Sequence, residues 1–299
     1  MLMGTLVAMH YPTSLFAGLA DHTYVKCGTG GKAWGCWGGK TGGTELRRGV
    51  GSTNQADAIA EPNERAGISC YLINGVCHQA ANRILLPAAI TVRGARGYDV
   101  SEALFGTYGR PRGPFGTCPS PFNQHADVTG DLAQCADTLP AKAPKRSPKT
   151  AVARSLRARR DEQKYIRGIL AIYRRAEPLT KVSARRLAGP DLEGFHLKLF
   201  MHKVEYSLRS GLDKSLSRKL QDVRLSAERS RMKIEDWFSH REMKASEFVR
   251  AFNKETILFQ EAAAGVLKAK QYKALFGLEP GDTVILADPT IVRKAFRDK

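Results

Sequence analysis

The sequence lacks any uninterrupted apolar run of about 18 residues, the length that a membrane-spanning helix requires. It also lacks Lys and Arg across residues 1–22, and Pro12 interrupts the apolar stretch there, so we expect no export signal and a cytoplasmic protein. Acidic residues are scarce, with 29 Asp and Glu against 47 Lys and Arg, a formal net charge of +18. This imbalance favours anionic partners such as nucleic acid, a membrane surface or acidic proteins.

Cysteine is absent from the second half of the sequence, and no CxxC pair occurs in the first half. Structural zinc sites are built from closely spaced pairs of ligands, and we therefore expect no metal. The glycine-rich segment 28–51 lacks the full GxxxxGK(S/T) spacing of a phosphate-binding loop, so no cofactor is predicted either. Without an export signal the thiols should stay reduced. The six cysteines are Cys27, Cys36, Cys70, Cys77, Cys118 and Cys135.

A segment rich in Pro and Lys, residues 136–150, separates two unlike parts of the chain. It has no large aromatic residue, so it cannot bury enough surface to fold alone. We therefore predict an α+β domain over residues 1–135, a linker over 136–150 and a basic, all-α domain over 151–299. The second domain carries most of the charge excess, a net +13 against +5 for residues 1–150.

Hydrophobic periodicity places the expected elements. The sequence HTYV from His22 is typical of a strand, and the glycine-rich segment 28–51 excludes a helix. After a polar turn near residues 54–60, apolar residues recur every four positions, which predicts a helix that ends at Pro87. Residues 90–100 suggest a strand and a turn, followed by a short helix. Two apolar stripes predict long helices in the second domain: Tyr165, Ile166, Ile169, Leu170 and Tyr173, and Phe248, Phe252, Phe259, Ala262 and Val266.

The strongest candidates for chemistry are Cys77, at or near the start of the predicted helix, and His22 in the predicted strand. A helix N-terminus and a nearby imidazole both favour the thiolate form of a cysteine. Backbone N–H groups of the first helical turn can also stabilise the oxyanion of a tetrahedral intermediate. These residue types therefore point to hydrolysis or acyl transfer through a thioester.

Residues 5–95 resemble the circularly permuted papain-like fold of the NlpC/P60 superfamily, in the branch that includes lecithin:retinol acyltransferase-like proteins. The resemblance rests on a strand that begins with histidine, a glycine-rich β region, and a helix that carries Asn-x-x-Cys-His. It implies that His22 is the base and Cys77 the nucleophile. The acyltransferase relatives have Asn directly before the cysteine, whereas this chain has Val76. The third polar group of the family's site has no clear counterpart here.

Alternative assignments stay open at this point. In the ordinary papain-like order, Cys77 would pair with His125, with Asp127 or Gln124 as the orienting residue. His78 and Asn74 are lesser candidates for the site. Cys70 would be the nucleophile if the helix began at Ser69.

We therefore expect a cysteine-dependent amide or ester hydrolase or acyltransferase, with a substrate that the sequence does not identify. The alternative is a non-enzymatic binding or assembly protein whose basic helices contact an anionic partner. The charged helices of the second domain are also compatible with a homo-oligomer.

Overall fold

The computed structural model describes residues 3–13, 20–28, 31–35, 39–67, 71–73, 75–109, 151–182, 190–209, 212–240 and 242–295. Its first part contains an antiparallel sheet of strand order β3-β2-β1-β4. Tyr11 in β1 faces His22 in β2, and Val25 in β2 faces Trp34 in β3. The strands are β1 (Met3–Tyr11), β2 (His22–Cys27), β3 (Ala33–Trp34) and β4 (Thr44–Ser52).

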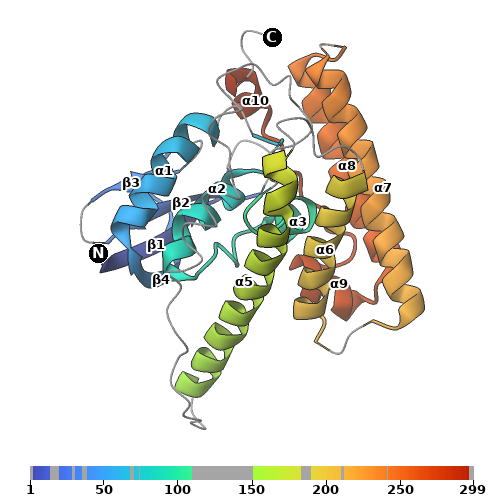
Figure 1. The fold of residues 1–299 in the computed structure, drawn as a ribbon. Coiled ribbons are helices and arrows are strands. Elements are labelled where there is room, and N and C mark those ends of the chain that lie inside the picture. Colours follow the sequence, from blue (N-terminus) through green and yellow to red (C-terminus); the bar gives the residue numbers. More distant parts are fainter. Residues whose placement is uncertain are drawn as a thin grey trace.

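Two helices cover this sheet: α1 (Thr53–Gly67) and α2 (Cys77–Leu85), which packs on β2 and on α1. The 3-10 turn η1 (Leu86–Ala88) then contacts β4 closely. An added Cβ at Gly51 would lie 2.6 Å from the carbonyl carbon of Pro87, so only glycine lets β4 approach this turn. The sheet and its helices form the left-hand part of Figure 1.

The second part of the chain consists of long helices, with the short helix α3 (Tyr98–Phe105) of the first part packed between them and α2 (Figure 1). α7 and α8 lie side by side along one edge of the molecule. The bounds are α5 (Ala151–Val182), α6 (Pro190–Ser207), α7 (Lys214–Ser239), α8 (Ala245–Val266), α9 (Ala269–Phe276) and α10 (Pro289–Ala295). The α+β class is thus confirmed.

The two large hydrophobic clusters of the described residues join the two parts of the chain. One combines Leu6 and Val25 of the sheet with the α5 stripe around Ile169. The other combines Val100 of α3 with Phe252 and its neighbours in α8. Both stripes predicted from periodicity are therefore largely buried, but they pack against elements from before residue 110. The predicted linker, 136–150, lies outside the described residues, and the domain boundary stays a prediction.

Three local predictions are wrong. Residues 53–67 form a helix rather than a polar turn, because Ala56, Ile59 and Ala60 share one buried face. Leu72 belongs to a turn with φ +67 and not to the periodic helix, which begins only at Cys77. Residues 90–97 form no strand and make only an isolated bridge between Arg93 and Ala95, because the glycine-rich sequence turns directly into α3.

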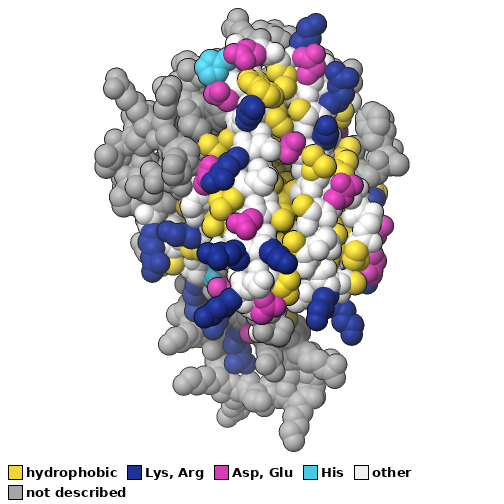
Figure 2. Space-filling model, turned by 90° about the vertical axis from the view of Figure 1, so that its right-hand side faces the viewer, with side chains coloured by type: hydrophobic (Ala, Val, Ile, Leu, Met, Phe, Trp, Pro, Cys, Tyr) yellow, Lys and Arg dark blue, Asp and Glu magenta, His cyan; other side chains and the backbone are white. Residues whose placement is uncertain are grey.

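The face formed by α7 and α8 carries both signs of charge. Figure 2 shows Lys and Arg side chains spread among Asp, Glu and hydrophobic side chains on this face. Trp237 and Leu258 are its exposed large hydrophobic residues, 39% and 44% accessible. No helix among the described residues is long and apolar enough to cross a bilayer. Contact of the helices with an anionic partner, or with a second copy, stays a prediction.

Candidate functional site

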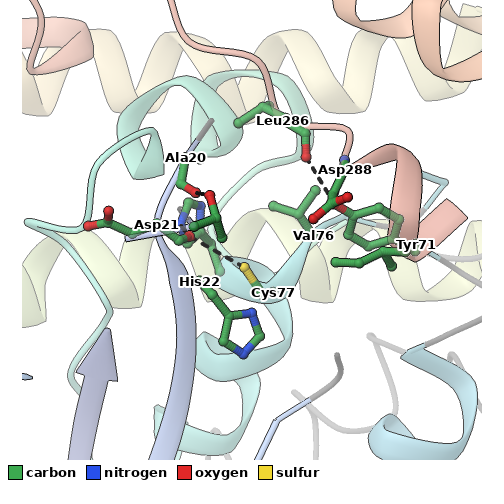
Figure 3. Close-up of a pocket in the computed structure, with 11 residues that line it drawn as sticks. Ala20, Asp21, His22, Tyr71, Val76, Cys77, Leu286 and Asp288 are labelled. Carbon is green, nitrogen blue, oxygen red and sulfur yellow. Dashed lines mark hydrogen bonds between the residues drawn. The ribbon is translucent and has the colours of Figure 1, made fainter. Parts of the chain in front are cut away.

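Cys77 and His22 line the same pocket (Figure 3). His22 is the first residue of β2 and Cys77 is the first residue of α2, so a strand start and a helix start meet at this point. The predicted position of Cys77 at a helix start is confirmed. Ser69 and Cys70, the alternative helix start and nucleophile, lie outside the described residues. The pocket has about 330 Å³ of empty space, part of it open to solvent.

The loop before α2 fixes where the helix begins. Leu72 N–H donates to the Gly75 carbonyl at 2.8 Å, which closes a tight turn. An added Cβ at Gly75 would lie 2.7 Å from the Cβ of Gln79, so this close approach requires glycine. The Gln79 side chain in turn accepts from the Val76 N–H at 3.0 Å. These bonds occupy groups next to Cys77 and leave its thiol directed into the pocket.

The Cys77 thiol is protonated at neutral pH. It donates a hydrogen bond to the Asp21 carbonyl, with Sγ and O 3.7 Å apart. Burial raises the pKa of the thiol above its usual 9.0, whereas hydrogen bonds from Thr23 and from the His78 backbone act in the opposite direction. Desolvation outweighs these donors, even though part of Cys77 stays exposed.

His22 is a neutral imidazole in the same pocket. It is 4% exposed, and burial lowers its pKa to about 4, which the negative charge of Asp288 offsets only in part. Its Nε2 atom is buried without a hydrogen-bond partner in the described part of the chain. No hydrogen bond joins His22 to Cys77 there. The Tyr11 ring packs on the imidazole with 4.9 Å between centroids and limits its movement on that side.

Asp21 connects the start of β2 to the start of α2. Its carbonyl oxygen accepts from the Cys77 thiol and also from His78 Nε2, at 3.0 Å. Its carboxylate shares a 2.8 Å hydrogen bond with His10 and accepts from the Arg96 N–H at 2.9 Å. Asp21 therefore holds the two elements at a fixed distance from each other.

His78, a lesser candidate, is fully buried and has partners on both ring nitrogens. Nδ1 lies 2.8 Å from Ser101 Oγ and Nε2 lies 3.0 Å from the Asp21 carbonyl. Both ring nitrogens are thus engaged within the described part of the chain, and His78 also lines the pocket. The other sequence candidates, Asn74, His125, Asp127 and Gln124, lie outside the described residues.

The structure adds a wall that sequence analysis missed. Leu286, Asp288 and Ile291, from near the C-terminal end of the chain, complete the pocket opposite His22 (Figure 3). No local signal in the sequence pointed there, because Asp288 precedes Pro289 in a pattern that only indicates a helix start.

A metal-binding group of three or more His, Cys, Asp or Glu residues does not occur within the ranges that the structure describes. The arrangement instead offers a sulfur nucleophile, a nearby imidazole and the N–H groups at the start of α2. A search with the whole chain matches no protein-family model, no curated protein and no solved structure.

Proposed function

We propose that this protein is a cysteine-dependent amide or ester hydrolase or acyltransferase, with Cys77 as the nucleophile and His22 as the base. The observation that carries the proposal is that both side chains line one pocket, at the first residue of a helix and of a strand. Helix α2 directs the positive end of its dipole at the sulfur, which favours negative charge there. A papain-like scaffold of the permuted NlpC/P60 type would supply this same pairing.

Acylation begins when the Cys77 sulfur attacks the substrate carbonyl carbon and its proton passes to the imidazole of His22. A C–S bond forms, and the carbonyl π electrons move onto the oxygen. N–H groups of the first turn of α2 stabilise this oxyanion, an effect worth about 3 kcal/mol per donor. The oxyanion then collapses, the bond to the leaving group breaks, and His22 returns the proton to that group.

The second half of the reaction releases the acyl group. A water molecule or another nucleophile attacks the thioester, and His22 accepts its proton. Collapse of the second tetrahedral intermediate expels the Cys77 sulfur, which takes the proton back from the imidazole. The net reaction is hydrolysis with water, and acyl transfer with any other acceptor.

The resting site holds a neutral thiol and a neutral imidazole, so proton transfer accompanies attack rather than preceding it. The thiol must first leave the Asp21 carbonyl, which it contacts at 3.7 Å. This hydrogen bond involves sulfur, a weak donor, so a substrate carbonyl entering the pocket can replace it at small cost.

The test is acylation of the full chain by p-nitrophenyl acetate at pH 7.5, followed by p-nitrophenol release and mapping of the acetyl group by peptide mass spectrometry. Cys77→Ser should abolish the thioester adduct, and His22→Gln should slow its formation by roughly a hundredfold. Cys27→Ser is the matched control, because Cys27 is a partly exposed cysteine of β2 that does not line the pocket. It should behave as the wild type.

An adduct confined to other residues, or equal acylation of wild type and His22→Gln, would contradict the proposal. In that case the alternative, a binding or assembly protein with an inactive pocket, would be favoured.

A further inference from the structure

The pocket wall opposite Cys77 comes from an extended segment, residues 284–288, that α8 holds in place. The Gln260 side chain donates to the Val284 carbonyl at 2.8 Å and accepts from its N–H at 3.0 Å. Asn253 makes the same pair of bonds with Ala287, both at 3.0 Å. Two side-chain amides thus bind the backbone of this segment, whose Ile285 carbonyl also accepts from the Ala20 N–H at 3.3 Å.

Tyr71 ties this segment to the loop before α2. Its hydroxyl donates to the Leu286 carbonyl at 3.0 Å and accepts from the Asp288 N–H at 3.2 Å. The segment is therefore fixed from both sides, and Asp288 occupies a defined place at the pocket (Figure 3).

Asp288 is 9% exposed, and only one of its carboxylate oxygens is engaged within the described chain. Oδ1 accepts from the N–H and the hydroxyl of Thr290, at 2.7 and 2.6 Å. Oδ2 accepts no hydrogen bond from a described residue. The Asp288 carboxylate thus accepts hydrogen bonds at the start of α10 through Oδ1, and its Oδ2 atom is left at the pocket, where it can accept a hydrogen bond from a bound group.

The charge of the pocket differs from that of the whole protein. Its described lining includes the carboxylates of Asp21 and Asp288 but no Lys or Arg, although the chain carries a net charge of +18. The Asp21 carboxylate is already bound to His10 and to the Arg96 backbone. The Nε2 atom of His22, which is buried and has no hydrogen-bond partner among the described residues, is a second polar group left for a bound molecule.

We propose that Asp288 binds a cationic group, an ammonium or a guanidinium, of the acyl substrate that Cys77 attacks. This inference rests on the proposed acyl chemistry and names its substrate class. The Oδ2 atom accepts a charge-assisted hydrogen bond from the cation, and the reactive carbonyl lies on the Cys77 side of the pocket. An anionic acyl group is excluded by the same carboxylate.

The experiment uses three p-nitrophenyl esters of similar length: ε-aminocaproate, caproate and the adipate monoester, which are cationic, neutral and anionic. The rate of acylation at Cys77 is measured at pH 7 in the full chain. A charge-assisted hydrogen bond should make the cationic ester react roughly tenfold faster than caproate, and the anionic ester slowest. Asp288→Asn should remove this preference, so that the ratio of the cationic to the neutral rate falls to about one. Asp282→Asn, an exposed position outside the pocket, should retain it.

Equal rates for the three esters in the wild type would overturn the inference while leaving the proposed function intact. An equal loss for all esters in Asp288→Asn would also overturn it, because Asp288 would then act on His22. If no ester acylates Cys77, the proposed function fails, and binding of n-butylammonium tests Asp288 by itself. That cation should raise the melting temperature of Cys77→Ser but not of the Cys77→Ser, Asp288→Asn double variant, whereas n-butanol should raise neither. A shift that survives Asp288→Asn would contradict the inference.

Discussion

The Asp21 carbonyl oxygen accepts a hydrogen bond from the Cys77 thiol, with the two atoms 3.7 Å apart. This contact joins the residue before β2 to the first residue of α2. It keeps the sulfur in its protonated form in the resting protein, and the raised pKa of the thiol has the same effect.

Alkylation of Cys77 should therefore be slow at neutral pH and accelerate above pH 9. The hydroxyl of Thr23 lowers the pKa of this thiol, so Thr23→Val, a change of nearly equal volume, should raise the pKa and slow alkylation further. The rate is measured with iodoacetamide as a function of pH, by peptide mass spectrometry. Thr256→Val, at a buried threonine of α8, is the control. Rapid alkylation of Cys77 at pH 7 would contradict this electrostatic description.

Stability should fall as the pH decreases from about 6.5 to 4. Burial lowers the pKa of both His22 and His78 to about 4, below the usual 6.5, so the unfolded chain binds more protons in this range. Each residue contributes on the order of 3 kcal/mol at neutral pH, and this contribution is lost as the pH falls. The pKa of Glu102 is lowered to about 2, so its contribution is lost only below about pH 4.5.

The measurement is the free energy of unfolding in urea at a series of pH values. His22→Gln should flatten the dependence of this free energy on pH between pH 6.5 and 4.5. An unchanged slope in His22→Gln would show that His22 is not buried as a neutral group.

Lys203→Met should destabilise the fold strongly. The Lys203 ammonium, 1% exposed, donates to Glu102 at 2.8 Å and to Asp99 at 2.5 Å, and so joins α6 to α3. Without the ammonium, the carboxylates of Glu102 and Asp99 lie near each other with less positive charge to neutralise them. Removal of one partner of a buried ion pair typically lowers the free energy of unfolding by about 3–5 kcal/mol. Denaturation in urea measures the change. Lys273→Met removes an exposed ion pair with Glu279 and should have almost no effect. Equal effects of the two substitutions would contradict the assignment of a buried network.

Gln260→Leu should loosen the segment that carries Asp288. The backbone N–H and carbonyl of Val284 would lose their partners while buried, which costs roughly 1–3 kcal/mol. Hydrogen exchange at the Val284 amide should accelerate more than exchange in the core of α8. Gln221→Leu, on α7, should leave the Val284 amide unchanged, because Gln221 bonds only within its own helix to Ser217. Protection of Val284 in Gln260→Leu would show that α8 does not hold the segment.

Much of the local structure could be predicted from sequence. The period of apolar residues located the buried stripe of α5, because a helix places residues three and four apart on one face. The β-branched and aromatic run at His22 located β2. The sequence located the start of α2 only approximately. The apolar spacing that predicts this helix extends back to Leu72, which the structure places in a turn.

The candidate site could be predicted from the sequence only in part. Cys77 and His22 each stand at the start of an element, which sequence can indicate, and both line one pocket. The thiol partner Asp21, the structural role of His78 and the wall at Asp288 depend on contacts between segments far apart in the chain. A local sequence pattern does not indicate which distant segments come into contact.

Sequence patterns alone located the buried stripe of α5, the strand at His22 and the placement of Cys77 at a helix start, and the composition gave the positive charge of the chain. Folding of the whole chain placed the α5 stripe in one hydrophobic cluster with Leu6 and Val25 of the sheet, and placed Asp288 at the pocket. Periodicity in the sequence determines which face of a helix or strand is apolar. The residues that cover this face depend on how the whole chain packs.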